Sequence, residues 1–158
     1  MLEALNQARA DADTSAELTF PLMATWQRAV LGVPEAGFRS GAAFAKGGRE
    51  RYGLTPGVPE RFEARMREGG QPSLPLAARA ARVYLDVAFF HPFADGNARA
   101  ALLALYFVLA REQVVLDEVG PLPVVTRRAD DAPGAFALAQ LVGMLAAATA
   151  KRMPPAPH

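Results

Sequence analysis

Hydrophobic positions recur along most of the chain at the spacing of amphipathic helices. Apolar residues separated by three and four positions mark one face of a helix, and turn residues interrupt the pattern between segments. The pattern predicts helices over residues 2–12, 21–31, 59–68, from near Pro75 onward behind a capping Ser73, over 98–110, and from Pro133 onward behind Asp130 or Asp131. About six helices of this kind predict an all-α domain.

The helical pattern fails over residues 32–57, where Gly, Pro and charged residues dominate. Short apolar stretches around Phe44 and Tyr52 flank the pair Gly47-Gly48. This arrangement is typical of a hairpin with short arms and a glycine turn. A surface loop without paired strands is the alternative interpretation.

Composition restricts the classes of protein that the chain can belong to. Its 158 residues are 51% hydrophobic, enough for one domain with a sizeable core. It has no cysteine, which excludes disulfides and thiolate metal sites and leaves the redox compartment undetermined. A cytoplasmic protein is the default expectation. The N-terminus lacks a secretory pattern. No uninterrupted apolar run reaches the roughly 18 residues of a spanning helix, so we predict no membrane contact.

Charge and the remaining reactive residues exclude further classes. The net charge is +1, although residues 28–82 hold ten Lys or Arg against five Asp or Glu. Arginines there alternate with glutamates, as on a solvated surface, so a nucleic-acid partner is disfavoured. His91 and His158 are the two histidines, which argues against a zinc site. The serines lie in cap or loop contexts without the pattern of a hydrolase nucleophile.

Residues 91–99, His-Pro-Phe-Ala-Asp-Gly-Asn-Ala-Arg, carry the candidate chemistry and lead directly into the Ala/Leu-rich helix. Gly96 allows backbone angles closed to other residues, and Asn97 is a suitable N-cap. Free amides at a helix N-terminus bind anions. Arg99 in the first turn opposes the helix dipole unless an anion is bound beside it. The sequence therefore predicts an anion site at this helix start.

Two further residues of this stretch fit phosphate chemistry. Asp95 is a hard oxygen ligand, of the kind that holds a magnesium ion bridging phosphates. His91 has an unperturbed pKa of roughly 6.5, which suits it to take a proton from a hydroxyl. Phe89 and Phe90 beside it favour the neutral imidazole through desolvation. A base, a metal ligand and an anion site thus lie within nine residues.

This stretch resembles the Fic motif, His-x-Phe-x-Asp/Glu-Gly-Asn-Gly-Arg-x-x-Arg. The resemblance implies the Fic fold, an all-α domain with a small β-hairpin flap before the active-site helix. It implies a general base at His91, a buried anchor at Phe93, a magnesium ligand at Asp95, and nucleotide-binding positions at Gly96, Asn97, Ala98 and Arg99. It further implies that residues 36–56 form the flap, which binds a target by strand addition, with Arg39 as its anchor.

Two positions depart from the motif. Ala98 stands where most members have a second glycine, and it adds a methyl group beside the expected phosphate path. Leu102 stands where they have a final arginine, and it removes a charge that in the family binds the distal phosphates of ATP. No regulatory segment Ser/Thr-x-x-x-Glu-Gly/Asn is present. Transfer chemistry is therefore better supported than nucleotide binding of the usual kind.

By this resemblance we expect transfer of a nucleotide monophosphate, most simply AMP, onto a hydroxyl of a protein or small molecule. ATP or another nucleoside triphosphate and Mg²⁺ would be required. One alternative is a Doc-like phosphotransferase, whose motif shares Asn97 and Arg99 but has Lys in place of Ala98. Another is a binding module that has lost turnover.

We predict three parts along the chain: an N-terminal helical extension over 1–19, the Fic domain over 20–150, and a disordered tail over 151–158. The broad apolar stripe of the last helix favours core burial and is compatible with a homodimer.

Overall fold

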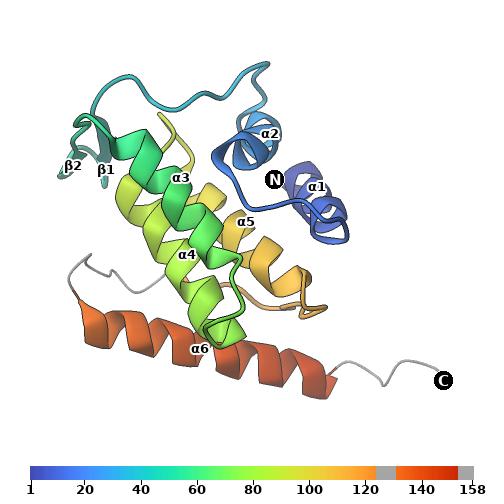
Figure 1. The fold of residues 1–158 in the computed structure, drawn as a ribbon. Coiled ribbons are helices and arrows are strands. Elements are labelled where there is room, and N and C mark those ends of the chain that lie inside the picture. The colour runs from blue at the N-terminus through green and yellow to red at the C-terminus, as the bar shows by residue number, and fades with distance from the viewer. Residues whose placement is uncertain (124–130, 153–158) are drawn as a thin grey trace.

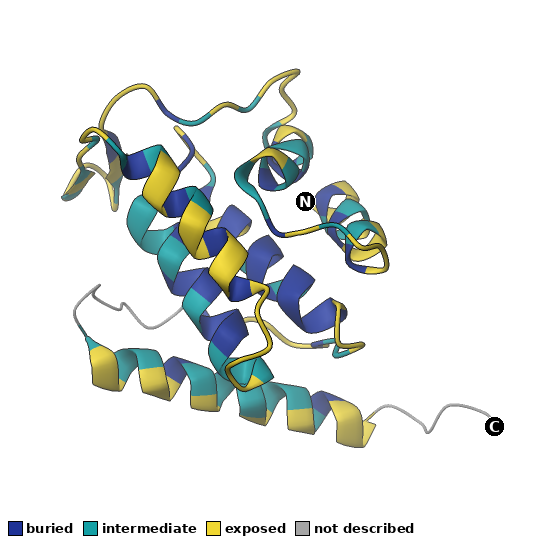
Figure 2. Ribbon diagram, in the orientation of Figure 1, coloured by how far each residue is buried: buried dark blue, intermediate teal, exposed yellow. Residues whose placement is uncertain are grey.

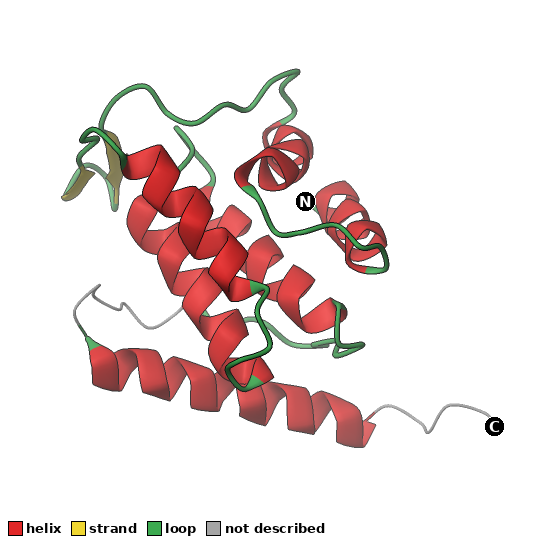
Figure 3. Cartoon of the chain, in the orientation of Figure 1, coloured by secondary structure: helices red, strands yellow, loops and turns green. Residues whose placement is uncertain are grey.

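The structure, a computed structural model, describes residues 1–123 and 131–152 and consists mainly of helices (Figure 1, Figure 3). Its elements are α1 Leu2–Ala12, α2 Phe20–Leu31, β1 Ala43–Ala45, β2 Glu50–Tyr52, α3 Val58–Gly69, α4 Leu76–Phe90, α5 Asn97–Ala110 and α6 Ala132–Arg152. The strands form an antiparallel hairpin, with Phe44 opposite Arg51. The predicted all-α class with a hairpin before the motif helix is confirmed, and the last helix includes the first two residues of the predicted tail.

Helix α5 forms the centre of the core, with ten of its 14 residues buried (Figure 2). Helices α4 and α1 pack directly against it, while α3 and α6 lie on α4. Its Ala and Leu side chains explain this position, because small and flexible apolar residues allow close packing on several sides. The start of α5 is therefore held by the most buried part of the molecule.

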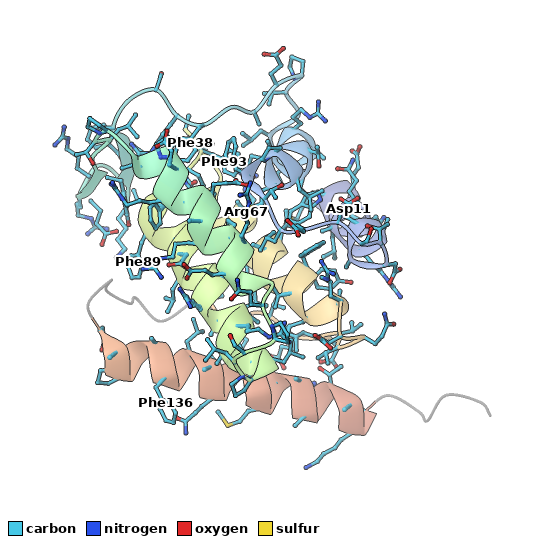
Figure 4. The ribbon with its side chains drawn as sticks, in the orientation of Figure 1. Asp11, Phe38, Arg67, Phe89, Phe93 and Phe136 are labelled. Atoms are coloured by element: carbon cyan, nitrogen blue, oxygen red, sulfur yellow. The ribbon has the colours of Figure 1, made fainter. Side chains whose placement is uncertain are left out.

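An aromatic cluster fixes the motif loop against the helices. Phe93 is 1% exposed, and its ring stacks on that of Phe20 at a centroid distance of 5.2 Å. Phe20 also contacts Phe38, which lies near Phe93 in Figure 4, and Phe62. Phe62 in turn contacts Phe90 at 5.5 Å. The expected burial of Phe93 is confirmed, and α2, α3 and the end of α4 meet at the loop.

The predicted cap of the last helix is confirmed at Asp131, whose side chain accepts a hydrogen bond from the Gly134 amide at 2.9 Å. Asp130 lies outside the described residues. Ser73 is not the cap of α4, whose N-cap is Pro75 and which has no side-chain cap. The helix begins at Leu76, so Ser73 lies two residues before the N-cap position, from which a side chain accepts the amides of the first turn.

Helix α6 corrects the expectation that no segment has the length and composition of a spanning helix. It has 21 residues, and an 18-residue window within it has a mean hydropathy of 1.5, so by length and composition it could cross a membrane. It packs along α4, burying Leu138, Val142 and Thr149. Phe136 and Met144 are more than 60% exposed, and Phe136 points away from α4 in Figure 4.

A largely buried carboxylate on α4 leads to a stability prediction. Asp86 Oδ2 has no hydrogen-bond partner among the described residues and lies 3.8 Å from Arg82 Nε. Burial raises the pKa of Asp86 from 3.8 to about 6, against the opposing effect of Arg82. A raised pKa means that the folded state prefers the neutral acid, so ionisation at neutral pH destabilises the fold.

We expect Asp86→Asn to stabilise the protein by about 2–3 kcal/mol at pH 7, because a tenfold displacement of a protonation equilibrium corresponds to about 1.4 kcal/mol. The gain should be absent below pH 3.8, grow up to about pH 6 and stay constant above it. Urea denaturation over this pH range measures it. A gain that does not vary with pH would contradict the explanation.

Candidate active site

One cavity of about 620 Å³ brings the flap and the start of α5 together. The predicted catalytic, metal and nucleotide-binding residues all line it, namely His91, Asp95, Gly96, Asn97, Ala98 and Arg99. Its other walls are the flap, the last turns of α4 and Pro123. The contiguous motif thus forms one site, which the hairpin covers from the other side.

The helix start at this cavity differs from the predicted one in its capping residue. Gly96, with φ 74° and ψ 17°, is the N-cap of α5, and within the described residues no side chain caps it. The buried Asn97 side chain instead accepts from the Phe93 amide at 3.0 Å and donates to the Phe93 carbonyl at 2.9 Å. Asn97 therefore closes the loop, and the amides of residues 97–99 keep the orientation toward an anion.

Gly96 is required by space as well as by its backbone angle. A Cβ there would lie 2.5 Å from Gln27 Nε2 and 3.2 Å from Arg99 Nη2. Gln27 is fully buried on α2, and its Nε2 donates to the Asp95 carbonyl at 2.6 Å. Sequence reasoning missed Gln27. The feature that could have indicated it is the position of a polar residue on the apolar face of the helix, one turn after Met23.

His91 is held in one orientation by its own helix. It follows α4 as the C-cap residue in the left-handed conformation, with φ 46° and ψ 61°. Its Nδ1 lies 2.7 Å from the Ala88 carbonyl oxygen. Because a carbonyl can only accept, Nδ1 carries the proton, and Nε2 is left as the basic nitrogen.

The surroundings of His91 favour its neutral form. Burial lowers the pKa of the imidazole, and the positive charge of Arg39 acts in the same direction. The bond to Ala88 and the charge of Glu50 oppose this shift. A neutral imidazole with a free Nε2 can accept a proton at neutral pH. The sequence analysis expected burial to favour the neutral imidazole, and the lowered pKa of His91 has this direction.

A flap residue covers the imidazole. The Tyr52 ring stacks on that of His91 at a centroid distance of 3.6 Å and an angle of 10°. The Tyr52 hydroxyl donates to Glu50 at 3.0 Å, and Glu50 also accepts from Lys46 Nζ at 2.7 Å. Burial and Glu50 raise the pKa of Tyr52 to about 12. The sequence had indicated Tyr52 only as an arm of the hairpin.

Arg39 connects the flap to His91 and is buried, with 7% of its surface exposed. Its guanidinium donates to backbone carbonyls at both ends of the hairpin and at the end of α4. These acceptors are Gly41, Tyr52, Gly53, Phe90 and His91. The predicted anchoring position of Arg39 is confirmed, and the backbone of the candidate base is part of what it holds.

The donor set around Asp95 fits a metal that arrives with phosphates. Asp95 is exposed at the cavity, and its Oδ1 accepts from the Gly96 amide at 2.6 Å. The described residues contain no cluster of three or more His, Asp or Glu that could hold a metal ion. Magnesium commonly binds through one or two carboxylates, with substrate phosphates and water as the other ligands.

The two departures from the motif lie in different environments. Ala98 is exposed and lines the cavity, so its methyl group faces the space where a phosphate would lie. Leu102 packs against the hydrophobic core and is not part of the cavity wall. In the described part of the chain, the cations at the wall are Lys46, from the flap, and Arg99.

Comparison with known proteins identifies the family of the chain. The model of the Fic/DOC family matches residues 26–109, which is more than half of the chain. The chain belongs to the Fic/DOC family. Its fold is similar to that of a Fic-domain-containing signaling protein from Bacteroides thetaiotaomicron, with a TM-score of 0.62 and 17% sequence identity. The match covers 91% of this chain and 65% of that one. No curated protein matches the chain.

The stack on His91 gives a prediction for Tyr52. In Tyr52→Ala we expect the pKa of His91 to rise, because the imidazole loses the cover that desolvates it. Tyr52→Phe keeps the ring and should leave the pKa near that of the unaltered protein. The titration can be followed by NMR in a His158→Ala background, where His91 is the single histidine. An unchanged pKa in Tyr52→Ala would contradict the role of the ring.

Proposed function

We propose that the protein transfers a nucleotide monophosphate, AMP from ATP, onto a hydroxyl group. The observation that supports this best is the pairing of His91 with the start of α5 in one cavity. The imidazole has a fixed tautomer with Nε2 available, and the helix start presents amides without a side-chain cap. A proton acceptor and an anion site at the wall of one cavity are the parts that transfer to a hydroxyl requires.

In this mechanism, Nε2 of His91 accepts the hydroxyl proton while the hydroxyl oxygen attacks the α-phosphorus. A new phosphorus–oxygen bond forms, the bond between the α-phosphorus and the bridging oxygen breaks, and pyrophosphate leaves. The amides of residues 97–99 and the Arg99 side chain stabilise the negative charge on the phosphate oxygens. Bound by Asp95 and phosphate oxygens, Mg²⁺ would supply further charge neutralisation.

The flap provides the surface for the target. Its two strands are short, and a polypeptide that pairs with one edge would lie along the cavity that contains His91. The Arg39 contacts fix both ends of the hairpin relative to the imidazole. Backbone pairing would therefore set the position of a target hydroxyl relative to the base.

Labelled nucleotides test the proposal. Incubation with Mg²⁺ and ATP labelled at the α-phosphate should label a target, and label at the γ-phosphate should not be transferred. Transfer of γ-label would instead identify a Doc-like phosphotransferase. Measurable ATP binding with no transfer of either label to any acceptor would identify a binding module.

A further inference from the structure

A second cavity, of about 440 Å³, adjoins the candidate active site. Tyr52 and Phe89 line both cavities. Among the residues that the structure describes, the wall of this second cavity contains three arginines, two phenylalanines and no acidic residue, and we call it the arginine cavity. Its lining residues are Arg39, Arg51, Tyr52, Gly53, Val58, Arg61, Phe89 and Phe90.

The positive charges around the arginine cavity are not balanced within the described residues. No carboxylate there lies within ion-pair distance of Arg39, Arg51 or Arg61, whereas neighbouring arginines of α3 pair with glutamates. The partners of Arg39 are backbone carbonyls, which satisfy its hydrogen bonds and leave its charge in place. Among residues 1–123 and 131–152, the Arg61 guanidinium donates hydrogen bonds to the neutral oxygens of Pro56 and Thr55 and to no carboxylate.

The apolar wall strengthens the attraction for an anion. Phe89 and Phe90 are both partly buried, so they lower the local dielectric beside the guanidinium groups. A carboxylate in this place would form charge-assisted and bidentate hydrogen bonds with arginine. The chemistry that fits is an acidic side chain with a short apolar stem.

The strand register places this cavity relative to a target hydroxyl. Glu50 and Tyr52 share one face of the flap, and Tyr52 stacks on His91. Arg51 lies between them in sequence, so by the alternation of a strand we expect its side chain on the opposite face from Glu50 and Tyr52. The side chains of a target strand paired with the flap would alternate between the same two faces. If the hydroxyl residue of the target faces His91, the residues before and after it therefore face the side of Arg51.

We propose that the arginine cavity binds an acidic side chain of a polypeptide target, at the position next to the residue that carries the acceptor hydroxyl. This inference rests on the proposed function for the role of the hydroxyl. It narrows the target to a protein segment in which glutamate or aspartate adjoins serine, threonine or tyrosine.

The test uses fluorescein-labelled peptides with a central threonine flanked on both sides by glutamate or by glutamine. Binding to the full chain is measured by fluorescence anisotropy without nucleotide. The unaltered protein should prefer the glutamate peptide on the order of tenfold, as expected for charge-assisted bonds to arginine. In Arg51→Gln combined with Arg61→Gln, the preference should disappear.

The matched control is Arg9→Gln combined with Arg28→Gln, which removes the same charge from exposed positions on α1 and α2. This control should keep the preference. The inference is overturned if the preference survives in the Arg51 and Arg61 variant, or if the control loses it equally, since net charge alone would then explain it.

A parallel assay of α-label transfer separates this inference from the proposed function. If both peptides are labelled equally and neither is preferred in binding, the inference fails and the transferase function stands. If the glutamate peptide is preferred through Arg51 and Arg61 but no acceptor is labelled, the transferase function fails. The cavity would then remain a docking site for acidic segments.

Discussion

Replacing His91 with asparagine is expected to lower the rate of nucleotide transfer by about 10²–10⁴-fold, the range that one general base contributes. Asparagine tolerates the left-handed conformation that His91 adopts, and its side-chain amide can donate to the Ala88 carbonyl. It lacks a basic nitrogen. The substitution therefore removes the proton acceptor and leaves the helix end and the flap in place.

The rate is measured as α-label transfer at saturating ATP, with circular dichroism to confirm the fold. His158→Asn is the matched control, because it removes the other histidine of the chain, and it should leave the rate unchanged. The pH profile gives a second readout. Since burial lowers the pKa of His91, the rate of the unaltered protein should fall only below about pH 6.5, and the asparagine variant should lack this limb. A rate within about threefold of the original would remove His91 from the mechanism.

The sequence predicted which motif residues would meet at one cavity, because these residues are nearly contiguous. His91, Asp95 and Arg99 lie within one loop and the first turn after it, so local geometry alone brings them to one cavity. Hydrophobic spacing also located each helix, since the faces that pack together are the faces that repeat every three or four residues. Short-range rules were sufficient for both results.

Contacts between residues far apart in the sequence could not be predicted by local rules. Gln27 binds the Asp95 carbonyl across 68 positions, and no local rule relates α2 to that loop. The stack of Tyr52 on His91 depends on how the hairpin folds back over the end of α4. Recognising Tyr52 as an arm of the hairpin therefore gave its secondary structure and not its partner.

Capping showed how competing local interactions defeat a residue preference. Asparagine is a preferred N-cap residue, yet the Asn97 side chain binds the backbone amide and carbonyl of Phe93 and closes the loop. Gly96 takes the capping position because its left-handed backbone is what the turn requires. This exchange is compatible with the proposed anion site, because a side-chain cap would occupy one of the amides that such a site would use.

Arg39→Gln is expected to destabilise the protein by about 3 kcal/mol and to release the flap from His91. The guanidinium contacts five backbone carbonyls, and glutamine offers donors for two at most. Each buried carbonyl that is left without a donor costs about 1–3 kcal/mol, although water entering from the adjacent cavities recovers part of this. Urea denaturation measures the loss of stability.

Hydrogen exchange of the flap amides distinguishes release of the hairpin from general loss of stability. In Arg39→Gln the amides of residues 43–52 should exchange faster, at a denaturant-free condition where those of α5 remain protected. Arg51→Gln is the control, because it removes an exposed arginine of the same hairpin and should change stability by less than about 0.5 kcal/mol. If Arg39→Gln and Arg51→Gln behave alike, the flap is held by its own strand pairing, and the carbonyl contacts of Arg39 do not determine where it lies over His91.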